Sequence, residues 1–167
     1  MFPSPERIRQ LLSYDKETGV FVWKMRTSNR IKVGQEAGRE RKDPRGYSSY
    51  VDIGIDGFRW PAHRLAWAWM TGEKPENDID HIDRNGMNNA WGNLRAATRS
   101  QNLMNTGVFA HNTSGYKGVS YRKDTKKWSA YIQVNSRKIC LGCFNDAKKA
   151  HEARLAYAVE EFGEYHP

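Results

Sequence analysis

The chain has 167 residues, room for one ordinary domain or two to three small modules, and it contains two cysteines, too few for a disulfide framework. No apolar run approaches the about 18 residues of a membrane span, and the charged start MFPSPERIRQ argues against a signal peptide. A secreted or membrane protein is therefore not expected, and the cytoplasm is the expected location. With 27 Lys or Arg against 19 Asp or Glu, the formal net charge is +8. This charge favours a polyanionic partner, because basic residues docked on phosphates release counterions; solubility alone is the other explanation.

The charge is distributed in three blocks. Residues 1–75 hold 14 basic and 9 acidic residues, residues 76–113 hold 3 and 4, and residues 114–167 hold 10 and 6. Two basic flanks around a slightly acidic centre would suit a cation site between DNA-binding regions, and chance would also produce such small differences. We divide the chain into an N-terminal mixed α/β region (1–75), a central motif (76–106), a linker (107–113) and a C-terminal domain (114–167).

The first block alternates between helix and strand signals. Ser4 and Pro5 are typical of a helix start, and Asp56-Gly57 is typical of a two-residue hairpin turn. The predicted elements are a helix over 5–12, strands over 19–24, 50–55 and 58–60, and a helix that follows Pro61 and ends at Gly72.

The last block predicts three short strands followed by one long helix. The strands cover 116–121, 128–134 and 138–141, and the helix starts after Asn145 or Asp146 and ends near Gly163. Alternation in the middle strand puts one set of side chains toward the helix, Trp128, Ala130, Ile132 and Val134. The opposite set is available to a ligand, Ser129, Tyr131 and Gln133. The expected fold class is α+β.

The central block contains a group of residues that suits phosphodiester hydrolysis. Asp80 and His81 are adjacent at the end of a short predicted strand, Asn93 follows twelve residues after His81, and Asn102 follows nine residues later. Carboxylate and amide oxygens suit a hard cation such as Mg²⁺, and an imidazole can take a proton from water near neutral pH. The same residue types are common in turns and helix caps, so ordinary loop chemistry is the alternative.

The stretch IDHIDRNGMNNAWGNLRAATRSQNLMN resembles the HNH nuclease motif, in the variant of phage and intron-encoded homing endonucleases. The resemblance implies a ββα-metal site with one Mg²⁺ or Mn²⁺ ion, held by Asp80 and Asn102. It implies that His81 is the general base and that Asn93 braces the loop that orients His81. The implied activity is a metal-dependent DNA endonuclease that leaves a 5′ phosphate and a 3′ hydroxyl, in a bacterial host cell if the gene belongs to a phage.

The segment AHRLAWAWMTGE also recurs before such motifs in phage proteins. We interpret His63 and Arg64 as support for the site, with a phosphate contact for Arg64, and core packing is an equal alternative. For Asp78, Asp83 and Asn85 we favour turn chemistry.

Residues 114–165 resemble the APETALA2-type DNA-binding domain in the segments YKGVS, KKWSAYI, LGCF and AHEARLAYA. The resemblance implies a three-stranded sheet that packs on one helix and reads the major groove. The positions that correspond to DNA contacts are Lys117, Ser120, Arg122, Tyr131, Gln133 and Lys138. Ser120, Gln133 and Cys140 stand where the plant domain has Arg or Trp, so its target sequence does not transfer. Cys140 and Cys143 lack the second ligand pair of a zinc site, so we expect packing or surface roles for both.

The sequence therefore predicts a nuclease that acts on double-stranded DNA, with no membrane partner. No heptad pattern appears and the two flanks differ, which favours a monomer that nicks one strand. A sequence-specific regulatory DNA-binding protein with a vestigial nuclease centre is the main alternative. An RNA-binding protein would explain the charge but not the motif.

Overall fold

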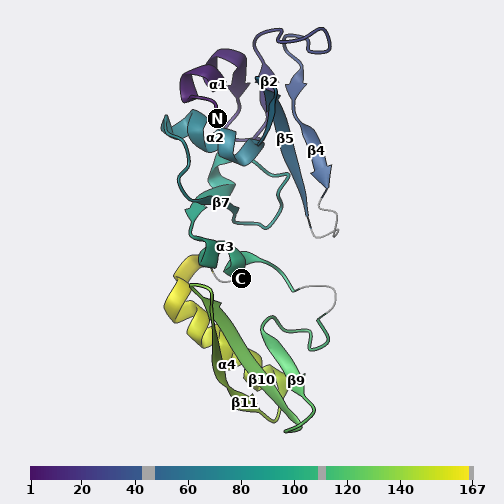
Figure 1. Cartoon of the computed structure of the whole chain (residues 1–167), viewed down its shortest axis with the longest axis vertical. Helices are drawn as coiled ribbons and strands as arrows, with labels where there is room; N and C mark the ends of the chain where they lie inside the picture. The colour runs from purple at the N-terminus through teal and green to yellow at the C-terminus, as the bar shows by residue number, and fades with distance from the viewer. Residues whose placement is uncertain (43–47, 109–111, 166–167) are drawn as a thin grey trace. The chain divides into compact units, whose positions relative to one another are not determined.

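The computed structural model describes residues 1–42, 48–108 and 112–165, which form two compact units, Met1–Ala96 and Ala97–Pro167 (Figure 1). The α+β fold class is confirmed, with helices and small antiparallel sheets in both units. Of the predicted linker at 107–113, residues 109–111 lie outside the described residues.

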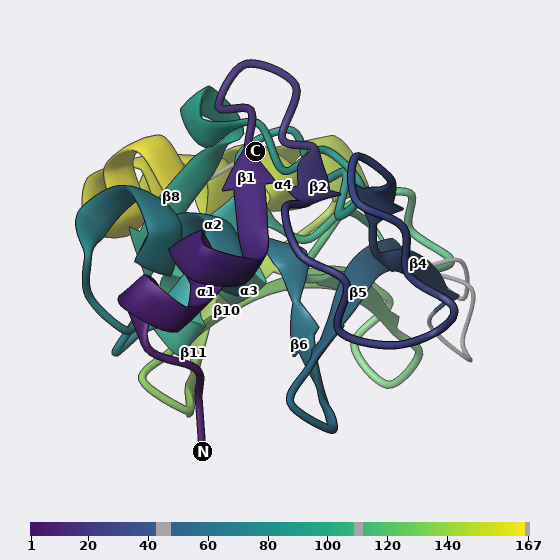
Figure 2. The ribbon, with the colours of Figure 1, turned by 90° about the horizontal axis from the view of Figure 1, so that it is seen from above.

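The first unit contains two three-stranded sheets and two helices. Helix α1 (Pro5–Leu11) precedes the sheet β1-β2-β3, made of Leu12–Tyr14, Phe21–Trp23 and Glu36–Ala37. The second sheet is β4-β5-β6, made of Arg39–Lys42, Ser49–Ile55 and Phe58–Pro61, and helix α2 (Ala62–Thr71) follows it. Helices α1 and α2 contact each other, and β4, β5 and β6 lie as adjacent strands (Figure 2).

Local signals explain several of these boundaries. The Ser4 side chain accepts a hydrogen bond from the Arg7 backbone N–H at 3.2 Å, which caps α1. Asp56 and Gly57 have positive φ values of 50° and 84°, as a hairpin turn of the primed kind requires. Gly72 is left-handed at φ 77° and ends α2. These predicted turns and caps are confirmed.

The core of the first unit joins both sheets to both helices. Ile8, Phe21, Ile53 and Leu65 are almost fully buried in one apolar cluster. The same cluster includes Leu94, and so attaches the strands of the candidate site to the core.

The second unit packs a sheet against a long helix. Its elements are α3 (Arg99–Asn105), β9 (Val119–Arg122), β10 (Lys127–Val134), β11 (Arg137–Phe144), α4 (Ala147–Phe162) and the short η2 (Gly163–Tyr165). The strand order is β11-β10-β9, and α4 contacts all three strands (Figure 1). Ala130 and Ile132 of β10 are buried at 0% and 2% exposure, which confirms the predicted inner face.

Helix α3 also belongs to the core of the second unit. Met104 clusters with Ile132, Ala158 and Phe162. The cysteines of β11 are both free and exposed. Among the helices in the described part of the chain, none is both long and apolar enough to cross a membrane.

Candidate active site

The candidate site is built on a two-stranded ribbon of β7 (Asp78–His81) and β8 (Leu94–Ala97), with the short helix η1 (Trp91–Asn93) before β8. Asp80 and His81 end β7 and are buried, at 4% and 6% exposure. Polar side chains at this depth need hydrogen-bond partners, because burial removes their water. The partners come from the connecting loop and from β8.

Asn93 ties the connecting loop together. Its amide oxygen accepts from the Asp83 backbone N–H at 3.0 Å, and its amide nitrogen donates to the Asp83 carboxylate at 2.9 Å and to the Asn88 carbonyl at 2.8 Å. The Asp83 carboxylate also accepts from the Asn88 side chain and the Asn85 backbone. Partial burial tends to raise the pKa of Asp83, but the hydrogen bonds outweigh it, and the pKa lies below its ordinary value. The loop is therefore held by an ionised carboxylate at its centre.

A residue that the sequence did not single out, Asn89, holds the imidazole of His81. Its amide oxygen lies 3.2 Å from Nε2 of His81, and its amide nitrogen donates to the Met87 carbonyl. With the amide in this orientation, Nε2 of His81 is the donor and Nδ1 is the basic nitrogen. Asn89 is 2% exposed. The adjacent Asn88 and Asn89 were the available signal, but their spacing does not show which of them faces inward.

Strand β1 and the turn between β1 and β2 hold the backbone around Asn89. The Tyr14 hydroxyl donates to the Asn89 carbonyl at 2.7 Å, and the Trp91 backbone N–H donates to the Lys16 carbonyl at 2.8 Å. Gly19 approaches so closely that a Cβ there would lie 2.2 Å from the Asn89 carbonyl carbon. The turn between β1 and β2 is therefore part of the support of the site.

Burial also sets the protonation of the site. It lowers the pKa of His81 below its ordinary value, although Asn89 and the charges of Asp83 and Asp80 oppose this. A neutral His81 at neutral pH can accept a proton.

A second histidine, His63 on α2, lies edge-on to His81 with ring centroids 4.9 Å apart. The Tyr50 ring of β5 lies beside both imidazoles, with its centroid 6.0 Å from that of His63 and 6.1 Å from that of His81. Burial, together with nearby His81, Arg64 and Arg41, lowers the pKa of His63 to about 3. Nδ1 of His63 is enclosed and has no hydrogen-bond partner among the residues that the structure describes. His63 thus packs beside the candidate base as a neutral ring.

The Arg64 side chain is bound to backbone carbonyl groups. Its guanidinium donates to the Asn77 carbonyl at 3.1 Å and to the Pro75 carbonyl at 2.9 Å, and so anchors the segment between α2 and β7. The phosphate contact expected of Arg64 stays a prediction.

Asp80 carries the carboxylate that would hold a cation. Its Oδ2 accepts from Nε of Arg95 on β8 at 2.9 Å, and the two side chains are 5% and 12% exposed. The hard oxygens of a carboxylate fit Mg²⁺, which takes one or two carboxylates and keeps several waters. The described residues contain no group of three or more His, Cys, Asp or Glu that could hold a metal ion. A cation at Asp80 would therefore also need amide or water oxygens.

The remaining predicted residues lie in the second unit. Asn102 is on α3, so its pairing with Asp80 stays a prediction. The Lys117 ammonium donates to the carbonyls of Leu103, Met104 and Thr106 at the end of α3, at 2.7 to 2.8 Å. This bond set stabilises the C-terminus of α3, a role that spacing along the chain could not show.

The other predicted DNA contacts lie on the sheet β11-β10-β9. Arg122 pairs with Asp124 at 2.6 Å, and Nζ of Lys138 lies 3.9 Å from the ring centroid of Tyr131. Ser120 and Gln133 are exposed. The structure thus brings Tyr131 and Lys138 together, and it leaves the DNA contacts as predictions.

Comparison with known proteins identifies the segment that carries the site. Residues 61–104 match the HNH endonuclease family, a segment that includes His63, Asp80, His81, Asn93 and Asn102. Over 77 residues the chain is 35% identical to Protein 3.8 of Escherichia phage T7, a match that covers 46% of this chain and 64% of that protein. No solved structure matches. The region around the site is therefore similar to HNH endonucleases, and the chain is similar to a phage protein.

Proposed function

We propose that the chain is a metal-dependent DNA endonuclease of the HNH kind. The observation that carries the proposal is the buried pair Asp80–His81, with Nε2 of His81 held by Asn89, within the segment that matches HNH endonucleases. A fixed imidazole beside a carboxylate is what hydrolysis of a phosphodiester with a single base requires.

His81 acts on the attacking water. Nδ1 accepts a proton from the water that attacks phosphorus. The amide oxygen of Asn89 accepts a hydrogen bond from Nε2–H and so stabilises the imidazolium that forms. Asn93 and Asp83 keep the loop in place, so that the ring does not reorient between turnovers. A Mg²⁺ or Mn²⁺ ion bound by Asp80 and Asn102 would stabilise the charge that develops on the scissile phosphate and the departing 3′ oxygen. The products are a 5′ phosphate and a 3′ hydroxyl.

The proposed reaction is a nick in one strand of double-stranded DNA by a monomer. One base per chain serves one strand, and the other strand runs in the opposite direction, so a second cut needs a second site or a second binding event. The APETALA2-like sheet of the second unit is proposed to select the target. The phage relative supports a bacterial host cell as the place of action.

A second function is favoured by the ion pair between Asp80 and Arg95. An arginine on the candidate ligand neutralises the charge that a cation would use. A DNA-binding regulatory protein with a vestigial nuclease centre would tolerate that arrangement.

Supercoiled plasmid incubated with Mg²⁺ or with EDTA separates the two functions. We expect the wild type to convert supercoiled plasmid to open circle in Mg²⁺ and not in EDTA. We expect His81→Ala to cleave about 10²–10⁴-fold more slowly and to retain the wild-type affinity for DNA. His151→Ala removes a histidine of the second unit that stacks on Tyr116, and serves as the matched control with wild-type cleavage. Binding without cleavage by the wild type would favour the regulatory protein.

A further inference from the structure

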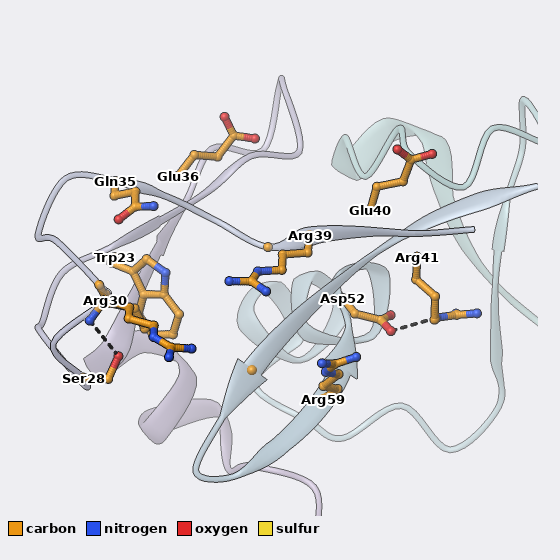
Figure 3. Close-up of a pocket in the computed structure, with 13 residues that line it drawn as sticks. Trp23, Ser28, Arg30, Gln35, Glu36, Arg39, Glu40, Arg41, Asp52 and Arg59 are labelled. Atoms are coloured by element: carbon orange, nitrogen blue, oxygen red, sulfur yellow. Dashed lines mark hydrogen bonds and ion pairs between the residues drawn. The ribbon is translucent and has the colours of Figure 1, made fainter. Parts of the chain in front are cut away.

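We propose that the sheet β4-β5-β6 carries a second DNA-binding site, a pocket that holds a backbone phosphate a few base pairs from the scissile bond. The pocket is a hollow of about 430 Å³ in the first unit, between the segment before β3 and the second sheet (Figure 3). Its arginines are Arg30, Arg39, Arg41 and Arg59. The inference rests on the proposed function, because it takes DNA as the ligand.

The arrangement of charges makes this pocket positive. Arg30, Arg39 and Arg59 are exposed, and their guanidinium groups have no hydrogen bond or ion pair to any residue that the structure describes. Arg41 pairs with Asp52 at 2.8 Å, so those two charges offset each other. Three guanidinium groups that are not paired with a carboxylate of any described residue therefore line one hollow.

The acidic residues at the rim do not cancel these charges. Residues two apart on a strand share a face, so Glu40 lies on the opposite face of β4 from Arg39 and Arg41. Glu40 accepts a hydrogen bond from the Ser49 hydroxyl at 2.6 Å. Figure 3 shows Glu36 and Glu40 directed away from Arg39, which extends toward Trp23.

The strand register creates the hollow. Arg39 lies opposite Asp52, and Arg59 lies opposite Gly54, on neighbouring strands of the sheet. Because Gly54 has no side chain, the space between these pairs is not filled from β5, and a Cβ at this position would meet only the Phe58 carbonyl, at 3.9 Å. Guanidinium groups bind phosphate oxygens through two parallel N–H bonds, so an anion of phosphate size suits this gap.

Strand β5 joins the pocket to the candidate active site, because Asp52 and Gly54 line the pocket and Tyr50 of the same strand lies beside His81. The Tyr50 ring contacts His81, and the Arg41 guanidinium carbon lies 5.1 Å from the Tyr50 ring centroid. From Tyr50 to Gly54 the strand advances about 13 Å, at about 3.3 Å per residue. This length corresponds to about four base pairs at 3.4 Å per step, so one duplex can contact both His81 and the pocket.

The salt dependence of DNA binding tests the pocket. The variant Arg39→Gln/Arg59→Gln removes two of its charges, and Lys16→Gln/Lys74→Gln removes two exposed charges of the same unit outside it. A labelled duplex is titrated by fluorescence anisotropy between 50 and 200 mM salt in EDTA, which prevents turnover.

We expect the slope of log K against log salt to fall by about 0.9 for Arg39→Gln/Arg59→Gln, because the two arginines share one phosphate and each phosphate contact contributes about 0.9. Across this fourfold salt range the wild type then loses about 3.5-fold more affinity than Arg39→Gln/Arg59→Gln. The lysine variant keeps the wild-type slope. Ethylation interference should place the lost contact about four base pairs to one side of the cut.

The conservative variant Arg39→Lys/Arg59→Lys keeps both charges and should keep the slope, which separates charge from folding if the glutamine variant unfolds. Equal slopes for Arg39→Gln/Arg59→Gln and Lys16→Gln/Lys74→Gln would overturn the pocket. The measurements distinguish a failure of the pocket from a failure of the proposed reaction. If the wild type binds DNA and does not nick it in Mg²⁺, the proposed reaction fails while the slopes still decide the pocket.

Discussion

His63 should make the first unit sensitive to mild acid. Burial lowers its pKa from 6.5 to about 3, so between these values the unfolded chain binds a proton that the folded chain excludes. The contribution of His63 to the free energy of unfolding is therefore fully present above about pH 6.5. As the pH falls below that value it decreases by about 1.36 kcal/mol for each pH unit. At pH 5 the loss attributable to His63 is about 2 kcal/mol.

The variant His63→Phe keeps a ring against Tyr50 and His81 and removes the titration. Five of the six tryptophans lie in the first unit, so tryptophan fluorescence during urea unfolding reports mainly on that unit. Between pH 7 and pH 5 we expect the wild type to lose about 2 kcal/mol more stability than the variant. Trp67→Phe on the same helix is the control and should keep the wild-type pH dependence. If His63→Phe and the wild type lose stability equally, His63 is not buried as a neutral group in the folded chain.

Three further outcomes follow from the site. Asn89→Ala should slow single-turnover cleavage, less than His81→Ala does, because the base remains but is no longer oriented; unchanged rates would show that Asn89 only packs. Asp80→Ala should stay inactive at raised Mg²⁺, whereas Asn102→Ala should recover part of its cleavage activity, since a neutral ligand contributes less than a charged one. If a Mg²⁺ titration gives the same apparent affinity for Asp80→Ala and for the wild type, Asp80 is not a ligand. Supercoiled plasmid should become open circle before any linear form, and linear product with second-order dependence on protein would instead indicate a dimer.

Local signals predicted much of the fold. The caps at Ser4, Gly72 and Asp146 and the turn at Asp56-Gly57 were readable because each depends on neighbours within four residues. The strand β4 was missed because all four of its residues are charged, and the alternation that marks a strand is absent there.

The candidate site was predictable in part for the same reason. Asp80, His81 and Asn93 lie on one ribbon and its loop, and the resemblance of this continuous stretch to the HNH motif singled them out together. Asn89 and Lys117 were beyond that reach, because the role of each depends on which way a side chain turns and on the carbonyl groups it meets. The structure supplies those partners, and a motif does not.

The bond from Tyr14 to Asn89 links the chemistry to the beginning of the chain. The group that orients His81 is itself held by residues about seventy-five positions earlier, outside the segment that matches HNH endonucleases. The matched segment alone is therefore not expected to carry out the proposed cleavage, because an excised fragment would retain Asp80 and Asn102 and lose the support of His81. We expect the proposed activity to be lost at the temperature at which β1 and β2 detach, because the Tyr14 hydroxyl of β1 holds Asn89.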